Sequence, residues 1–335
     1  MMRVGVIGLG WGRMHVAAFR AAGAEVVALC GLDAGRARAV ALAEGIALAT
    51  SDVDALCAAC DLVVVASPPE VHAAHVEAAW RHEKAVLCEK PLTVDAAEAT
   101  RLAAASAAAP PSAVNFPYRM LPTLGALRRW LEGRAPREIV VTIRNGTVSS
   151  DAPPAGREGD FGGASHVIDA ALWLARAGEP RWVEAALTPR RSAYLHLGLA
   201  DAVVAIAHVA APEPGIHGAW SLIGDGWEVG FAAGYVPARG GWCLSAVRAF
   251  ERGAWSTLAD AVEPGHGLEP WAQAHVDGAR EMLALVGGVA PTRLASLADA
   301  ARVQRVVAAA LASERAGRRV ELTPGGSEVD YVLAV

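Results

Sequence analysis

The first 118 residues of this 335-residue chain alternate short runs of β-branched and other apolar residues with alanine-rich segments of helical period. One run, from Leu62 to Ala66, is apolar at every position, which is typical of a strand covered on both faces. Six runs with five helical segments between them predict a doubly wound parallel sheet. The predicted strands are Arg3–Gly8, Ala24–Cys30, Ile46–Thr50, Asp61–Ser67, Ala85–Glu89 and Ser112–Phe116. The predicted helices are Arg13–Ala22, Ala34–Glu44, Asp52–Ala59, Glu70–Glu83 and Val94–Ala107.

Ser51 and Asp54 predict a capping box at the start of the third helix. After Arg119 the pattern changes, because turn residues now separate a series of apolar runs. Asp225-Gly226 between two of these runs is a strong hairpin signal. We therefore expect residues 1–118 to form one domain, and residues 119–335 to form an α+β domain with a large, mostly antiparallel sheet. Its predicted strands are Ile139–Arg144, Trp182–Leu187, Ala193–Leu199, Ala202–Val209, Ile216–Ile223, Trp227–Ala232 and Trp242–Val247. Its predicted helices are Leu121–Glu132, His166–Ala175, Pro270–Leu285 and Leu297–Glu314.

The composition excludes several classes of protein. Hydrophobic residues make up 53% of the chain and charged residues 19%, unlike the composition of a disordered chain. The arginines are dispersed and the formal net charge is -5, so no nucleic-acid partner is expected. No window offers the ~20 apolar residues of a membrane span, and no signal-peptide cleavage pattern follows the N-terminus. Five cysteines, an odd number within apolar runs, predict reduced thiols and a cytoplasmic location.

A glycine-rich turn joins the first predicted strand to the first helix. Such a turn lets the backbone approach a pyrophosphate, and the free N–H groups and dipole of the helix N-terminus favour that anion. The usual spacing puts the third small residue at position 13, whereas here Gly12 comes one residue earlier. The motif predicts dinucleotide binding, with a tight turn that holds no ligand as the alternative. The residues expected to bind are Gly8, Gly10, Trp11, Gly12 and Arg13.

The end of the second strand bears on the type of dinucleotide. NAD-binding domains place a carboxylate there to accept hydrogen bonds from the ribose, but this chain has Gly31. Arg36 and Arg38 lie close by and could accommodate a 2'-phosphate, which favours NADP(H) modestly over NAD(H). Two alternatives stay open: Asp33 reaches the ribose, or the two arginines are solvated charges on a helix surface.

Two more strands end in polar motifs at the carboxyl edge of the predicted sheet, where ligands bind. One ends in Ser67-Pro68-Pro69 with His72 beyond it, and the next ends in Glu89-Lys90. Only two of the 30 basic residues are lysines, Lys84 and Lys90. Because arginine cannot supply a deprotonatable amine, a lysine at this edge indicates proton chemistry, with a strand-end ion pair as the alternative. His72 and His75 have no third ligand at suitable spacing, so no metal site is expected.

These motifs resemble those of the glucose-fructose oxidoreductase, inositol dehydrogenase and MocA-like family (Gfo/Idh/MocA). The resemblance implies a Rossmann domain followed by a domain built on an open sheet, with NAD(P)(H) as cofactor and a secondary alcohol or ketone of a sugar, polyol or nucleotide-sugar as substrate. It also implies a homo-oligomer, a dimer or tetramer, formed through that sheet. Trp220, Trp227 and Trp242 either fill the core beneath the helices or, if exposed, mark the oligomer surface. The resemblance rests on Gly8-Leu9-Gly10 with His15, Ser67-Pro68-Pro69 with His72, Glu89-Lys90-Pro91-Leu92, Tyr118-Arg119, Gly163-Ala164-Ser165-His166-Val167-Ile168-Asp169 and the closing helix from Ala300 to Val307.

The resemblance implies roles for individual residues. Lys90 positions and polarises the reacting oxygen, and His166 accepts or donates the proton. Family dehydrogenases often carry an aspartate four residues before the histidine, where this chain has Gly162, so Asp160 or Asp169 is left to orient His166. Two other functions stay open: a cofactor-binding regulatory or accessory protein without turnover, and a reductase of an imine or conjugated double bond. Further cofactor contacts are expected from Ser67, Pro68, His72, Glu89 and Lys90, and substrate contacts from Arg119, Ser165 and Asp169.

Overall fold

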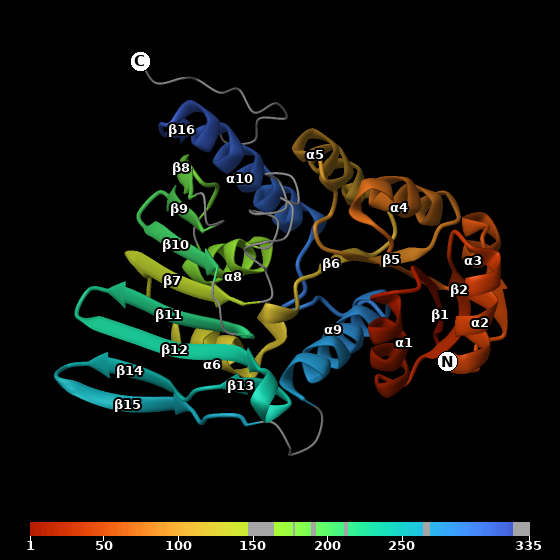
Figure 1. Cartoon of the computed structure of the whole chain (residues 1–335), viewed down its shortest axis with the longest axis horizontal. Helices are drawn as coiled ribbons and strands as arrows, with labels where there is room; N and C mark the ends of the chain where they lie inside the picture. The colour runs from red at the N-terminus through yellow and green to blue at the C-terminus, as the bar shows by residue number, and fades with distance from the viewer. Residues whose placement is uncertain (147–163, 177, 189–191, 211–213, 264–268, 324–335) are drawn as a thin grey trace. The chain divides into compact units, whose positions relative to one another are not determined.

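The computed structural model describes residues 1–146, 164–176, 178–188, 192–210, 214–263 and 269–323 (Figure 1). The chain divides into two compact units. The first comprises Met1–Met120 and Ala272–Gln304, and the second comprises Leu121–Trp271 and Arg305–Val335. This division differs from the predicted boundary between residues 118 and 119, because a late segment of the chain belongs to the first unit.

A six-stranded parallel sheet forms the centre of the first unit, in the order β3-β2-β1-β4-β5-β6. The chain order reverses between β1 and β4, so the predicted doubly wound sheet is confirmed. Every residue of β4 is buried, as its unbroken apolar run predicts. The strands are β1 (Arg3–Ile7), β2 (Glu25–Cys30), β3 (Leu48–Thr50), β4 (Leu62–Val65), β5 (Ala85–Glu89) and β6 (Ser112–Asn115). The helices between them are α1 (Gly12–Ala21), α2 (Ala34–Glu44), α3 (Val53–Ala59), α4 (His72–Arg81) and α5 (Ala96–Ala105).

The structure corrects two helix starts. The N-cap of α3 is Asp52, whose carboxylate accepts hydrogen bonds from the backbone N–H groups of Asp54 and Ala55, so the capping box predicted with Ser51 is wrong. Asp52 has the extended backbone that a cap requires, and the helix therefore begins one residue later than predicted. A 3₁₀ turn, Pro69–Val71, precedes α4 and takes the place of its predicted first residues.

The segment Ala272–Gln304 joins the first unit through long-range contacts. It contains most of α9 (Pro270–Val286) and the start of α10 (Leu297–Ala316). Ala295 forms a β-bridge with Val114, and Asp299 pairs with Arg119 at 3.3 Å. Gln304 Nε2 donates to the carbonyl of Val94 at 3.0 Å. Periodicity in the sequence gives no sign of these contacts, because it reports only local structure.

A ten-stranded sheet forms the second unit, in the order β15-β14-β12-β11-β7-β10-β9-β8-β16, with β13 paired to β12. Only β7 and β10 pair in parallel among these strands, so the predicted mostly antiparallel sheet is confirmed. The Asp225-Gly226 hairpin is also confirmed, because Gly224 pairs with Trp227 across it. The strands are β7 (Glu138–Asn145), β8 (Trp182–Leu187), β9 (Ala193–Gly198), β10 (Val203–Ala210), β11 (Ile216–Gly224), β12 (Trp227–Val236), β13 (Gly241–Leu244), β14 (Val247–Glu251), β15 (Ala254–Ala259) and β16 (Val320–Glu321).

The predicted strand Trp242–Val247 is divided into β13 and β14. Ser245 lies between them, and its backbone N–H donates to the carbonyl of Ala232 while its hydroxyl accepts from the Ala232 N–H. These two hydrogen bonds to β12 hold the chain where it leaves one strand and enters the next. β15 and β16 carry no signal strong enough for a prediction from the sequence, and both lie at the edges of the sheet.

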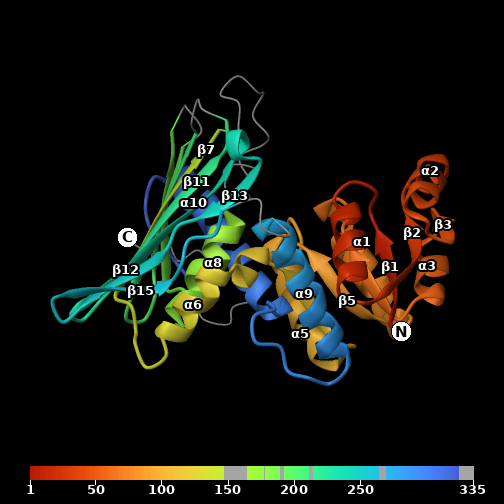
Figure 2. The ribbon, with the colours of Figure 1, turned by 90° about the horizontal axis from the view of Figure 1, so that it is seen from below.

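The two faces of this sheet differ. Helices α6 (Pro122–Trp130) and α8 (Ser165–Ala175) lie against one face, α6 on β14 and β15 and α8 on β7 and β10 (Figure 2). Trp220, Trp227 and Trp242 are buried, so they fill the core and do not mark an exposed surface. We call the opposite face the open face; the small, uncharged residues at its centre are Val140, Thr142, Ala205, Ala207, Ala219 and Ser221.

Among the described residues, no helix is long and apolar enough to cross a bilayer.

Candidate functional site

The glycine turn between β1 and α1 is held tightly against β4. Gly8 has a φ of +120°, and a Cβ atom there would lie 2.1 Å from the carbonyl oxygen of Ala66, so only glycine fits. At Gly12 a Cβ would lie 2.9 Å from Cγ1 of Val6, so Gly12 lets α1 pack closely on β1. Gly10 is different, because a Cβ there would meet nothing within 4 Å. The turn is therefore closed on its sheet side and open above Gly10.

The N-terminus of α1 lacks the side-chain cap that begins helices α2, α3 and α5. Aspartates cap α2, α3 and α5: Asp33, Asp52 and Asp95 each accept hydrogen bonds from first-turn N–H groups. The N-cap of α1 is Trp11, which makes no side-chain capping bond, and the first turn of α1 contains no acidic residue. The positive end of this helix dipole is thus left for an anion, and the open space at Gly10 fits a pyrophosphate.

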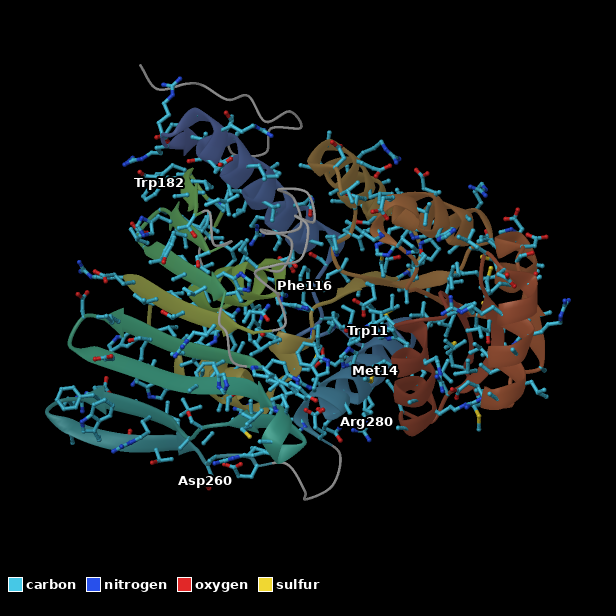
Figure 3. All side chains as sticks on the ribbon, in the orientation of Figure 1. Trp11, Met14, Phe116, Trp182, Asp260 and Arg280 are labelled. Atoms are coloured by element: carbon cyan, nitrogen blue, oxygen red, sulfur yellow. The ribbon has the colours of Figure 1, made fainter. Side chains whose placement is uncertain are left out.

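The two larger side chains of this turn, Trp11 and Arg13, contact other residues of the first unit. Trp11 is half exposed at the start of α1 (Figure 3). Its ring meets the ring of His275 edge to face at 5.9 Å. Arg13 pairs with Glu44 at 2.9 Å on the surface. Exposure of the indole leaves Trp11 accessible to a ligand, whereas Arg13 already has a carboxylate partner.

The end of β2 lies beside the glycine turn. A Cβ at Gly31 would lie 2.5 Å from a methyl group of Leu9, so a side chain there would have to displace the Leu9 side chain of the turn. One oxygen of Asp33 accepts the N–H of Arg36 at 2.7 Å and caps α2. Arg36 and Arg38 are both exposed. The strand end therefore presents no carboxylate of its own, and the nearest one is engaged in a helix cap.

Two histidines fix the loop after β4. The ring of His72 is buried, and its nitrogens lie 2.8 Å from the carbonyl of Ser67 and 2.9 Å from the carbonyl of Pro91. This ring thus connects the loop after β4 with the loop after β5. The Ser67 hydroxyl lies 2.9 Å from Nδ1 of His75, and burial lowers the pKa of His75. Pro68, the residue before the 3₁₀ turn, follows directly on this anchored serine.

Glu89, the last residue of β5, is buried and surrounded by hydrogen-bond donors. Its Oε1 accepts from His15 Nε2 and from Asn115 Nδ2, each at 2.7 Å. Its Oε2 accepts the backbone N–H of Lys90 at 3.1 Å. Burial acts to raise the pKa of Glu89, but the hydrogen bonds from His15 and Asn115 and the charges of His15 and His275 outweigh it and lower the pKa to about 2. The carboxylate is therefore ionised.

Lys90 follows Glu89 and is half-buried at the carboxyl edge of the sheet. Burial lowers the pKa of its ammonium group, and the negative charge of Glu89 opposes that effect. A lysine in this state gives up its proton more readily than a solvated one. This property is what proton transfer requires and what arginine cannot provide.

Three of the residues predicted to act on a substrate lie on α8 in the second unit. Ser165 and Asp169 are buried, and His166 is partly exposed. The His166 ring meets the Trp271 ring edge to face at 5.8 Å, and Trp271 stacks on Trp242. Asp160 and Gly162 lie outside the described residues, so their relation to His166 is not described. Arg119 lies in the first unit, where it is buried and pairs with Asp299.

The structure thus brings together within one unit the predicted residues from the ends of β1, β2, β4 and β5. It also shows polar residues that the sequence did not single out as functional: His15, Asn115 and His275 around Glu89. The sequence could have pointed to Asn115 as a functional residue, since it is one of only two asparagines in the chain and ends a strand. Among the described residues, no group of three His, Cys, Asp or Glu side chains could hold a metal ion.

The fold and this edge define a dinucleotide-binding protein of the doubly wound α/β class with a second domain built on a large sheet. Residues 2–111 match the model of the oxidoreductase family with an NAD-binding Rossmann fold, GFO_IDH_MocA. Residues 2–111 therefore form an NAD-binding domain of the GFO_IDH_MocA type, and the resemblance of the motifs is confirmed over these residues.

The chain is similar to several curated proteins of Saccharopolyspora erythraea. It is 34% identical to inositol 2-dehydrogenase 3 over 190 residues, which are 52% of this chain and 53% of that protein. It is 37% identical to inositol 2-dehydrogenase 2 over 202 residues, which are 57% and 58% of the two chains. The chain thus matches little more than half the length of these relatives.

Solved structures show the same fold across the whole chain. Myo-inositol dehydrogenase from Lactobacillus casei, in complex with NAD(H) and myo-inositol, superposes with a TM-score of 0.79 over 99% of each chain at 22% identity. A probable dehydrogenase from Thermotoga maritima gives a TM-score of 0.76 over 96% of this chain and 98% of that one at 20% identity. At these identities the likeness concerns the fold.

Proposed function

We propose that the protein is an NAD(P)-dependent oxidoreductase that acts on a secondary alcohol or ketone of a sugar-like, polyol or nucleotide-sugar substrate. The observation that carries the proposal is the state of Lys90: a half-buried amine with a lowered pKa, in the same unit as a glycine turn that fits a pyrophosphate. Relatives named inositol 2-dehydrogenase and D-apiose dehydrogenase support a polyol or sugar as substrate.

The proposed chemistry divides into hydride transfer and proton transfer. The nicotinamide cofactor, when bound, accepts or supplies the hydride. Lys90 holds the reacting oxygen and takes part in moving its proton, which its lowered pKa favours. His166 is the proposed partner in that proton transfer, since an imidazole titrates near neutral pH. Asp169 lies three residues further along the same helix and is the proposed residue that orients His166.

The remaining predicted contacts keep their proposed roles. Arg119, Ser165 and Asp169 are proposed to contact the substrate. The cofactor is proposed to bind at the turn through Gly8, Gly10, Trp11, Gly12 and Arg13, at the end of β2 through Gly31, Asp33 and Arg36, and at the ends of β4 and β5 through Ser67, Pro68, His72, Glu89 and Lys90.

We further propose a modest preference for NADP(H). Its support is Gly31 at the end of β2, the use of one oxygen of Asp33 as a helix cap, and the exposure of Arg36 and Arg38 a few residues further along the chain. Complexes of similar structures contain NADH or NAD(H), and this favours the opposite preference. The affinities of the purified protein for NADPH and NADH decide between the two preferences.

The function is tested by offering the protein both oxidised cofactors with a panel of inositols, aldoses and nucleotide-hexoses. We expect formation of reduced nicotinamide with at least one polyol or sugar, and tighter binding of NADPH than of NADH. If the cofactor binds but neither the panel nor keto-sugars in the reverse direction give turnover, the protein is a cofactor-binding accessory protein. Tighter binding of NADH than of NADPH would instead indicate that the carboxylate of Asp33 accepts hydrogen bonds from the ribose of the cofactor.

We propose a homo-oligomer formed through the open face of the second unit. The centre of that face is small and uncharged, and exposed apolar side chains surround it at Tyr194, Val203, Ile223, Phe250 and Trp255. Charged residues lie beside these apolar side chains or further out: Glu138 pairs with Val203 and Ile223, Glu228 lies between Ile223 and Phe250, and Arg144 and Glu184 are exposed. A centre that is free of charge, with exposed apolar side chains around it, is typical of a protein interface.

A charge at the centre of the open face should separate the subunits. Ala219 lies between Thr142 and Ala232, and Ala219→Glu would place a carboxylate where a second copy packs. We expect the mass measured by light scattering to fall to that of the monomer. Leu42→Glu, on an 84% exposed side chain of α2, is the control and should leave the mass unchanged. An unchanged mass for Ala219→Glu would exclude this face as the interface.

We also propose a cytoplasmic location. All five cysteines are free thiols, and four of them are buried. Burial raises the pKa of Cys57 to about 12 and that of Cys60 to about 11, so both stay protonated and serve packing. Free thiols in this number are typical of a reducing compartment.

A further inference from the structure

The contacts of Glu89 connect two functional parts of the first unit. His15 lies in the second turn of α1, the helix whose N-terminus fits the pyrophosphate, and it reaches Glu89 Oε1 at 2.7 Å. The other oxygen of the same carboxylate accepts the backbone N–H of Lys90 at 3.1 Å. A single carboxylate thus lies between the cofactor-binding helix and the proposed catalytic lysine.

Burial makes this arrangement sensitive to the loss of any donor. Glu89 is 7% exposed, His15 2% and Asn115 3%. An ionised carboxylate away from water is costly unless hydrogen bonds and opposite charge compensate it. The hydrogen bond and the charge of His15 do most to hold the pKa of Glu89 at about 2 against burial, and Asn115 and His275 add to them. The groups that face this carboxylate are His15 on α1, Asn115 at the end of β6, His275 on α9 and Lys90.

The ring of His15 is itself held from a second side. His275 packs edge to face on it, with ring centroids 5.7 Å apart. His275 comes from α9, and a Cβ at Gly278, one turn later on that helix, would lie 3.6 Å from Oδ1 of Asn115. Helix α9 therefore lies against both side chains that donate to Glu89 Oε1.

We propose that His15 is a positioning residue for Lys90: by donating to one oxygen of Glu89 it keeps that carboxylate ionised and oriented, so that the other oxygen holds the Lys90 backbone. The inference rests on the proposed function only in the catalytic role that it gives to Lys90. The hydrogen-bond chain from His15 to the Lys90 backbone is a property of the protein without cofactor or substrate.

The scarcity of lysine allows a direct test. Protein labelled with [15N]lysine gives backbone amide signals from Lys84 and Lys90 alone, and Lys84→Arg assigns them. The Lys90 amide proton donates to Glu89, so its chemical shift reports the charge and position of that carboxylate. Three variants are compared with the wild type over a pH series: His15→Leu removes the donor, His15→Gln keeps a donor nitrogen at a similar reach, and Glu89→Gln removes the charge.

We expect the Lys90 amide of the wild type to keep its shift as the pH falls to about 4, because Glu89 stays ionised there. In His15→Leu the signal should move toward its position in Glu89→Gln, or titrate at higher pH than in the wild type. His15→Gln should restore the wild-type signal, and the Lys84 signal should stay constant in all variants.

Two results would overturn the proposal. One is a Lys90 signal in His15→Leu that matches the wild type at every pH. The other is a His15→Gln signal displaced as far as that of His15→Leu, which would assign His15 to packing alone. If His15→Leu does not fold, His15→Asn takes its place, because its side chain is polar but too short to reach Glu89, and the same two results decide.

Once a substrate is known, the kcat and KM of the His15 variants provide a second test of the positioning role. We expect kcat to fall roughly ten- to a hundredfold in His15→Leu, with a smaller change in KM, since a displaced catalytic group slows the reaction more than it weakens binding. Restoration by His15→Gln is expected. An absence of turnover in the wild type would contradict the proposed function and leave the amide measurement as the test of His15.

Discussion

We expect Lys90→Arg to lower kcat for alcohol oxidation by about 10²- to 10⁴-fold, the usual contribution of a proton-transfer group. Arginine retains the positive charge and can bind an oxygen, but it does not release a proton at any pH that the protein tolerates. Wild-type Lys90 is suited to that release because burial lowers the pKa of its amine. The variant should still bind the reduced cofactor, as measured by quenching of protein fluorescence.

Lys84→Arg is the matched control, because it changes the other lysine of the chain in the same way. Lys84 precedes β5 at the opposite end of that strand from Lys90, and its replacement should leave kcat unchanged. Equal activity of Lys90→Arg and the wild type would remove Lys90 from the chemistry. Loss of cofactor binding together with activity would instead limit Lys90 to its proposed contact with the cofactor.

The second large effect is expected at the glycine turn, where two alanine substitutions should give different results. Gly8→Ala places a methyl group against the Ala66 carbonyl at a φ of +120°. Backbone strain of about 1–3 kcal/mol and overpacking of about 1–3 kcal/mol should together lower the free energy of unfolding by about 2–6 kcal/mol. Urea unfolding followed by circular dichroism measures this loss.

Gly10→Ala should leave the free energy of unfolding within about 1 kcal/mol of the wild type, because its methyl group enters open space. That space is where the pyrophosphate is proposed to lie, so the same variant should bind NADH and NADPH much more weakly. Unchanged cofactor affinity in Gly10→Ala would place the pyrophosphate elsewhere. Equal stability of the two variants would contradict the tight contact at Gly8.

The sequence predicts the first unit well where the information is local. The unbroken apolar run of β4 and the glycine turn before α1 have the structures that their patterns indicate. The ten-stranded sheet is predicted less completely, because β13 and β14 are separated by hydrogen bonds of Ser245 to a different strand. A single apolar run does not reveal where the strand breaks when the break is made by a partner elsewhere in the sequence.

The site shows the same limit. Glu89 and Lys90 can be placed at the carboxyl edge of the sheet from the chain order alone, and the structure has them there. The partners of Glu89 are 74 residues earlier, at His15, and 26 residues later, at Asn115. No periodicity joins such positions, so the burial of this carboxylate and its ionised state become visible only when the fold brings the donors together.

The late segment Ala272–Gln304 has a consequence for biosynthesis. A ribosome that has released only the first 120 residues has not yet made α9, which packs on Asn115 and on the ring of His15, or the Ala295 partner of Val114. The nucleotide-binding unit thus stays incomplete until most of the ten-stranded sheet has been translated. A nascent chain that stalls within that sheet therefore exposes an unfinished unit to proteases and chaperones, although all six of its parallel strands have already been made.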